Sequence, residues 1–111
     1  CRGVLLRGGL DIRGLLDTRD GALFSIARAR VKTGVTTRWH RLEGISERYL
    51  ILEGAGRVEV GDQEPHTVQS GDLVNIPAGC AQRITNEGSV DLVFLALCTP
   101  RFQRGAYQDL E

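Results

Sequence analysis

The sequence has few aromatic residues, no methionine and no excess of charge of either sign. Of its 111 residues 5% are aromatic, and Lys32 is the single lysine among 14 basic residues, which balance 14 acidic ones. A net charge of zero provides no global field that would draw the chain to nucleic acid or to an anionic membrane. We therefore expect neither kind of partner.

Cysteines and long apolar runs are also scarce. Cys1, Cys80 and Cys98 are odd in number and lack a Cys-x-x-Cys spacing, which argues against a disulfide framework and against a structural zinc site. No apolar run approaches the roughly 20 residues that a membrane-spanning helix needs, and residues 1–12 lack the sustained apolar stretch of a signal peptide. These features predict a cytoplasmic protein. Because Met is absent, we expect the native start to lie upstream or to have been removed.

What the sequence does contain is a series of short β-like segments separated by glycines. In residues 23–32 apolar and basic residues alternate, so that Val31 and two alanines would face a core while the arginines and Lys32 face solvent. Further strands are expected at residues 48–53, 57–60, 73–76, 82–85 and 91–98, and an edge strand within 4–16. Many short strands with glycine turns predict an all-β sandwich or barrel, in one domain over residues 1–111.

Two glycine-bounded segments carry most of the functional information. Residues 34–54 contain His40 and Glu47, and residues 71–86 contain Pro77. The segments resemble the two signature motifs of the cupin superfamily, G-x5-H-x-H-x3,4-E-x6-G and G-x5-P-x-G-x2-H-x3-N. Every glycine, the proline and the asparagine have the expected spacing. The resemblance to small single-domain cupins implies a double-stranded β-helix, or jelly-roll barrel, with residues 99–111 as its C-terminal tail.

The sequence departs from these motifs at two of the four metal-ligand positions. Leu42 stands where a second His is expected, and Gln82 where a third is expected. The resemblance therefore assigns His40, Glu47 and Gln82 as ligands of a divalent metal, such as Fe, Mn, Ni, Zn or Cu. One imidazole, one carboxylate and one amide are a weaker donor set than the two His and one carboxylate of non-haem iron oxygenases.

Residues beside these positions are expected to line a pocket, because residues i and i+2 of a strand share a face. The predicted pocket includes Leu42, Ile51 and Ile84, with Cys98 at its rim. Tyr49 would orient a ligand or move a proton, or else it would simply pack as a barrel aromatic.

Three functions remain open on this evidence. In the first, a metal-assisted oxygenase, isomerase or lyase uses the ion as a Lewis acid on a small oxygenated metabolite. In the second, a metal-free isomerase, epimerase or lyase uses His40 and Glu47 as a general acid–base pair, with Tyr49 beside them. In the third, a non-enzymatic module binds or senses a small molecule. Each predicts a small-molecule ligand, and the resemblance implies a homodimer that hides an edge strand.

Structural roles are the alternative for each of these residues. His40 could bond Glu47 without a metal, Gln82 could bond His40 or a water, and Cys98 could be a small buried apolar residue. We further expect Trp39 to cover the barrel mouth or a dimer contact. His66 is expected to lie exposed in a connector.

Two features at the ends of the motifs complete the predictions. Cys80 falls in the turn after Pro77 and has no evident partner. The tail is expected to form a short helix that packs Phe102 and Tyr107 back on the barrel.

Overall fold

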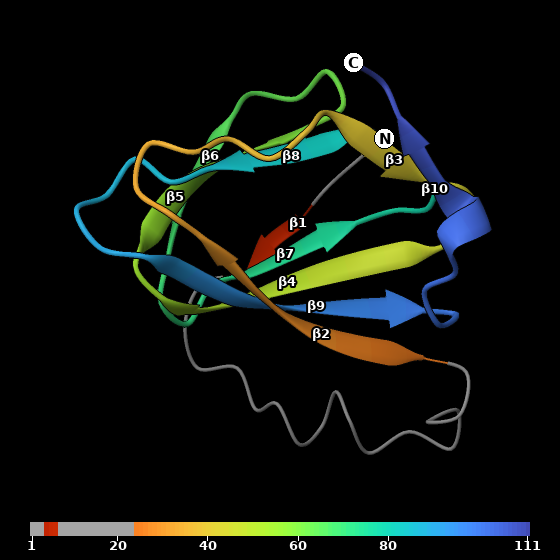
Figure 1. The fold of residues 1–111 in the computed structure, drawn as a ribbon, viewed down its shortest axis with the longest axis horizontal. Coiled ribbons are helices and arrows are strands. Elements are labelled where there is room, and N and C mark those ends of the chain that lie inside the picture. Colours follow the sequence, from red (N-terminus) through yellow and green to blue (C-terminus); the bar gives the residue numbers. More distant parts are fainter. Residues whose placement is uncertain (1–3, 7–23) are drawn as a thin grey trace.

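The computed structural model describes residues 4–6 and 24–111, which form two five-stranded antiparallel sheets facing each other (Figure 1). The first sheet has the order β1-β7-β4-β9-β2 and the second β10-β3-β8-β5-β6. The strands are β1 (Val4–Leu6), β2 (Ser25–Val31), β3 (His40–Leu42), β4 (Ser46–Glu53), β5 (Ala55–Val60), β6 (His66–Gln69), β7 (Leu73–Ile76), β8 (Gln82–Thr85), β9 (Leu92–Thr99) and β10 (Tyr107–Asp109). A 3-10 helix, η2 (Arg104–Ala106), precedes β10.

The predicted all-β architecture is confirmed, and so are the strands expected from alternation. Two strands were not predicted. Residues 66–69 form β6, so the interpretation of this segment as a connector with an exposed His66 is wrong, and His66 is half-buried. The tail forms only the three residues of η2 before it continues as β10. Of the predicted edge strand, β1 is present and pairs with β7, and the remainder lies outside the described residues.

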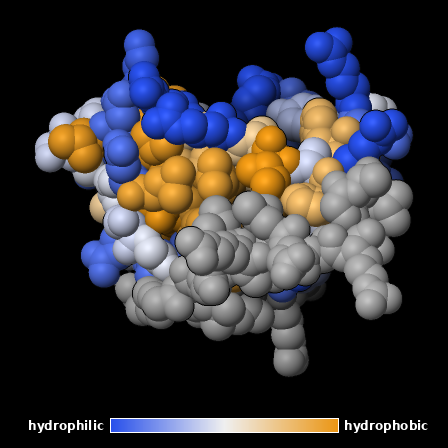
Figure 2. All heavy atoms as spheres, turned by 90° about the horizontal axis from the view of Figure 1, so that it is seen from below, coloured by the Kyte–Doolittle hydropathy of each residue, from blue (hydrophilic) through white to orange (hydrophobic). Residues whose placement is uncertain are grey.

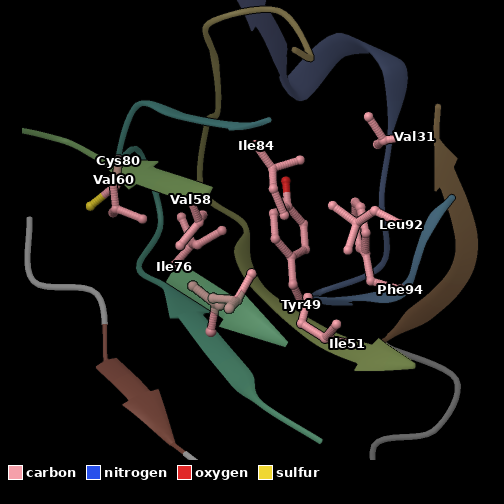
Figure 3. Close-up of a cluster of buried hydrophobic side chains, with 12 residues drawn as sticks. Val31, Tyr49, Ile51, Val58, Val60, Ile76, Cys80, Ile84, Leu92 and Phe94 are labelled. Carbon is pink, nitrogen blue, oxygen red and sulfur yellow. The ribbon is translucent and has the colours of Figure 1, made fainter. Parts of the chain in front are cut away.

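The space between the sheets is filled by the inward-facing residues of both. In β4 these are Glu47, Tyr49 and Ile51, and all three are buried. Tyr49 lies in the middle of the largest apolar cluster (Figure 3), with its ring centroid 4.5 Å from that of Phe94. In β2 the prediction for the two faces is confirmed in part, since Val31 belongs to this core, Ala29 packs against it and the arginines are exposed, whereas Ala27 is exposed as well. Because close packing fills the middle of the barrel, a polar site can lie only near the ends of the strands.

A smaller apolar cluster lies on the outer face of the first sheet. Leu50, Leu73 and Leu97 are buried there, and Leu95 packs against them. Ile26, which pairs with Leu97 and so shares this face, is 42% exposed. Apolar side chains are gathered on this side of the molecule (Figure 2). A face of this composition is suited to covering by further protein surface.

Cys80 corrects one expectation about the cysteines. It is disulfide-bonded, whereas Cys98 is a free, buried thiol. The number and spacing of the cysteines were therefore a poor guide, since they had argued against disulfides. No helix in the described part of the chain is long and apolar enough to cross a membrane.

Gly54 and Gly34 offer a matched pair for testing how the turns constrain the barrel. Both have a positive φ, of 82° and 80°, but only at Gly54 would a Cβ meet backbone, 2.6 Å from the Asp91 carbonyl oxygen. Gly34→Ala should cost about 1 kcal/mol, the usual cost of left-handed backbone for a residue with a Cβ. Gly54→Ala should cost about 1–3 kcal/mol more, because the clash is with main chain.

The measurement is the free energy of unfolding from urea denaturation of both variants. Equal losses of stability would contradict the close approach of β4 and β9 at Gly54.

Candidate functional site

Four strands bring polar side chains together at one end of the barrel. Glu47 is near the start of β4 and pairs with Cys98, near the end of β9. Gln82, the first residue of β8, pairs with His40, the first residue of β3. Glu47 and Cys98 meet because the start of one antiparallel strand lies beside the end of its neighbour. His40 and Gln82 meet because β3 and β8 pair only at their first residues. Residues distant in sequence thus meet at the end where β3 and β10 lie (Figure 1).

A chain of hydrogen bonds connects the buried members of this cluster. The Tyr49 hydroxyl donates to Oε1 of Gln82, and Nε2 of Gln82 donates to Oε1 of Glu47 at 2.7 Å. The Cys98 thiol donates to Oε2 of Glu47 at 3.7 Å, a distance within the longer range of sulfur contacts. All four side chains are buried. Each of these four side chains has a hydrogen-bond partner within the cluster, which offsets the cost of removing it from water.

Burial sets the protonation of these groups. It raises the pKa of Glu47, and the hydrogen bond from Gln82 and the nearby charge of His40 only partly oppose this. Burial also raises the pKa of the Cys98 thiol to about 12 and that of Tyr49 well above its usual range, and the Glu47 carboxylate adds to both. The thiol and the phenol thus stay protonated at neutral pH, and Glu47 is the group able to exchange a proton.

His40 lies at the rim of the cluster rather than within the hydrogen-bond chain. Its Nδ1 is 2.7 Å from the carbonyl oxygen of Arg38, and its ring stacks on Tyr107 with centroids 5.0 Å apart. A carbonyl only accepts, so Nδ1 carries the proton of this contact and Nε2 is the acceptor in the neutral ring. The structural alternative for His40 requires a hydrogen bond to Glu47. The described residues include no such bond.

The C-terminal tail closes this end of the barrel. β10 pairs with β3, and the amide of Glu43 donates to the carbonyl of Ala106 at 2.8 Å. Ala106 packs on a small cluster of Leu42, Ile45 and Cys98. The sequence did not indicate that Ala106 or Tyr107 would border the site, because the tail carries no motif residue. Ile45 was missed because it lies between motif positions. Phe102, expected to pack on the barrel, is 44% exposed.

The remaining predicted site residues lie at different depths. Leu42 is buried beside the polar cluster, whereas Ile51 and Ile84 lie within the large apolar core around Tyr49. Trp39 is half-buried and has the Arg83 guanidinium over its ring, 5.3 Å from the centroid.

The hydrogen bonds of Gln82 make the predicted donor set a poor one for a divalent metal ion. Gln82 is the weakest candidate ligand, since its amide oxygen already accepts from Tyr49 and its nitrogen is a donor to Glu47. The Cys98 thiol stays protonated and already donates to the same carboxylate. Within residues 4–6 and 24–111, no three His, Cys, Asp or Glu side chains form a group able to hold a metal. The amide of Gln82 instead does the work of holding Glu47 in place.

Comparison with known proteins settles the family. The family model described as "Cupin domain" matches residues 27–98, which include both glycine-bounded segments and all four strands of the polar cluster. The chain belongs to the cupin family. It is also 33% identical over 109 residues to the uncharacterized protein MJ1618 of Methanocaldococcus jannaschii, a match covering 96% of this chain and 86% of that protein.

Solved structures agree with this assignment. A predicted oxalate decarboxylase from Thermotoga maritima is 31% identical, with a TM-score of 0.64 over 68% of this cupin and 64% of that chain. The cupin thus spans less than two thirds of that protein's length. A double-stranded β-helix protein from Klebsiella pneumoniae, 13% identical, has a TM-score of 0.72 over 81% of this chain and 76% of its own. The second likeness shows the fold alone.

Tyr49→Phe tests the hydrogen-bond chain. Removing the hydroxyl leaves Oε1 of Gln82 buried without its donor, so we expect a loss of about 1–3 kcal/mol in the free energy of unfolding. Tyr107→Phe is the control, because Tyr107 is 40% exposed and its stacking on His40 does not need the hydroxyl. Urea denaturation measures both. A Tyr49→Phe variant as stable as Tyr107→Phe would contradict the network.

Glu47→Gln tests the raised pKa of Glu47. The folded state holds the proton more tightly than the unfolded state, whose ordinary pKa is 4.5. Stability should therefore fall as pH rises from 4.5 through the pKa of the buried carboxyl, because the buried group must then ionise. Glu47→Gln should abolish this fall and unfold a few degrees higher than the wild type at neutral pH. Melting temperature against pH is the measurement.

Glu59→Gln provides a control of opposite sign. The Arg83 guanidinium lowers the pKa of Glu59, so this carboxylate contributes stability above its unfolded pKa that is lost as pH falls. Its replacement should slightly destabilise the protein at neutral pH. If both variants changed the pH profile in the same direction, the assignment of Glu47 would be wrong.

Proposed function

We propose that this cupin binds a small oxygenated molecule at the polar end of its barrel and acts on it by proton transfer through Glu47, without a resident metal. The reaction class would be that of an isomerase, epimerase or lyase. The observation that supports this most is the hydrogen-bond chain from Tyr49 through Gln82 to Glu47. In this chain Gln82, at the fourth ligand position of the motifs, holds the Glu47 carboxyl in place by a hydrogen bond.

The environment of Glu47 suits general acid–base catalysis. A catalytic acid or base works best with a pKa near the working pH, and burial moves the pKa of Glu47 in that direction. Gln82 and Cys98 donate to different oxygens of the carboxyl and fix its plane. Tyr49 acts through Gln82, so it is a positioning residue for Glu47 rather than a group that touches the substrate.

His40 is the second proton-transfer group of the proposal. It is less buried than Glu47 and lies close enough for its charge to be felt by that carboxyl. With Nδ1 fixed on the Arg38 carbonyl, Nε2 would accept or return a proton at the ligand. Two groups whose environments differ can act as an acid on one side of a molecule and as a base on the other.

The ligand class rests on the setting of the site and on one relative. Leu42 and Ile45 provide an apolar border beside the carboxyl, which suits a small molecule with one polar and one carbon edge. The similarity to a predicted oxalate decarboxylase supports an organic acid or a related oxygenated compound. Metal-assisted chemistry is the second candidate, favoured by that same likeness and by the retained His40 and Glu47.

Metal content separates the two candidates. We expect the purified, untagged protein to contain only trace divalent metal by inductively coupled plasma mass spectrometry, with no change in His40→Ala. The double variant Leu42→His/Gln82→His restores both missing imidazoles of the motif and should gain near-stoichiometric metal, because imidazole and carboxylate ligands then surround one position.

Two outcomes would count against these statements, one against the metal-free site and one against the placement of residues 42 and 82 beside His40. Near-stoichiometric metal in the wild type, lost in His40→Ala, would overturn the metal-free site. A double variant that folds but gains no metal in a chelator competition would mean that positions 42 and 82 do not face the same space as His40.

The homodimer implied by the resemblance stays a prediction. The outer face of the first sheet, with Ile26 exposed beside the leucine cluster, is the surface that we expect such a dimer to bury. A cytoplasmic location likewise stays a prediction.

A further inference from the structure

A groove lies on the outer face of the second sheet, on the opposite side of β8 from the polar cluster. Along β8, Gln82 and Ile84 are buried in the interior, whereas Arg83 and Thr85 face outward and line the groove. The groove encloses about 350 Å³ and is bordered by three arginines, Arg38, Arg57 and Arg83. Three guanidinium groups around one depression are typical of sites that bind oxyanions.

All three arginines already pair with carboxylates at the surface. Arg83 forms a bidentate ion pair with Glu59, with N–O distances of 2.5 and 3.2 Å. Nε of Arg38 is 2.8 Å from the carboxylate of Asp109. The Arg38 and Asp109 side chains are 58% and 41% exposed. An exposed pair such as Arg38 with Asp109 contributes about 0–1 kcal/mol, so an added anion can displace it at little cost. The bidentate pair of Arg83 with Glu59, whose side chain is only 20% exposed, instead keeps the Arg83 guanidinium in place at the groove.

Arg57 differs from the other two arginines in having an unused donor. Its Nη1 is 3.2 Å from Glu87, but its Nε is buried without a hydrogen-bond partner, the one such side-chain atom in the described part of the chain. A buried donor without an acceptor is unfavourable by roughly 1–3 kcal/mol. An anion in the groove would supply that acceptor after a small rotation of the guanidinium, which is part-exposed.

Hydroxyl groups line the same groove and complete a polar site. Thr36 and Thr85 bond each other through their side-chain oxygens at 2.9 Å, so either can turn its proton toward a ligand. The groove also contains the carboxylates of Glu59 and Glu111. These oppose a highly charged ligand and favour one small oxyanion held at the Arg57 end.

We propose that this groove binds a small oxyanion, a phosphate or a carboxylate group, through Arg57 with Arg83 and the threonine hydroxyls. The site is independent of the proposed function, because its residues face away from the barrel interior. It adds a second ligand position to the molecule, on the opposite face of the same sheet.

The test is a titration of the ¹⁵N-labelled full chain with inorganic phosphate, and separately with acetate, at constant ionic strength. Saturable shifts are expected in the backbone amides of Thr36, Arg57 and Thr85 with at least one probe. Arg57→Gln should weaken binding about tenfold or more, as expected for a lost charge-assisted hydrogen bond. Arg57→Lys keeps the charge but lacks the fork, and should lose most of the affinity.

Arg28→Gln is the matched control, because Arg28 is exposed on the outer face of the first sheet. It should bind both probes like the wild type. Shifts that do not saturate, or that weaken equally in Arg28→Gln, would show non-specific attraction and overturn the site. Wild-type affinity in Arg57→Lys would overturn the assignment of Nε. Glu47→Gln should leave the titration unchanged. A result that overturns the oxyanion groove is therefore separate from one that overturns the proposed function of Glu47.

Discussion

The arrangement of the polar end of this cupin depends on one side chain, the amide of Gln82. It accepts from Tyr49 and donates to Glu47, and so connects a phenol and a carboxyl on one strand through a residue of the opposite sheet. An imidazole cannot serve two such partners as both acceptor and donor while it also binds a metal. The His-to-Gln change therefore converts a ligand position into an internal support. The inward carboxylate of Glu47 is held by the hydrogen bond from this amide.

The barrel itself was predictable because its turns depend on local chemistry. Gly34, Gly54, Gly71 and Gly79, four glycines of the two motifs, all have positive φ, a conformation that residues with a Cβ rarely adopt. The spacing of these glycines therefore predicts where the chain turns. Alternation likewise placed Val31 of β2 in the core. By contrast, β6 and β10 contain no residue of the two motifs and one aliphatic residue, Val68, between them, so nothing in their sequence indicated a strand.

The residues of the candidate site could be predicted from the sequence, but the contacts between them could not. His40, Glu47 and Gln82 could be named from motif positions, and strand alternation pointed Tyr49 inward. Which of them bond each other depends on the register of strands far apart in sequence, such as Glu47 opposite Cys98. Local sequence does not contain that register. Cys80 was missed for a similar reason, since the partner of a cysteine is set by the fold and not by spacing.

The C-terminal strand has a consequence for how fast a ligand can come and go. β10 is joined to β3 by three residue pairs, and its aromatic residue Tyr107 lies against the ring of His40 while remaining 40% exposed. A short, exposed edge strand separates from a sheet at a much lower free energy than the whole barrel unfolds. The rate of solvent exchange at His40 would then be limited by the rate at which residues 107–109 separate from β3. Access to this end of the barrel would then depend on the tail, whereas the positions of the polar side chains depend on the strands beneath.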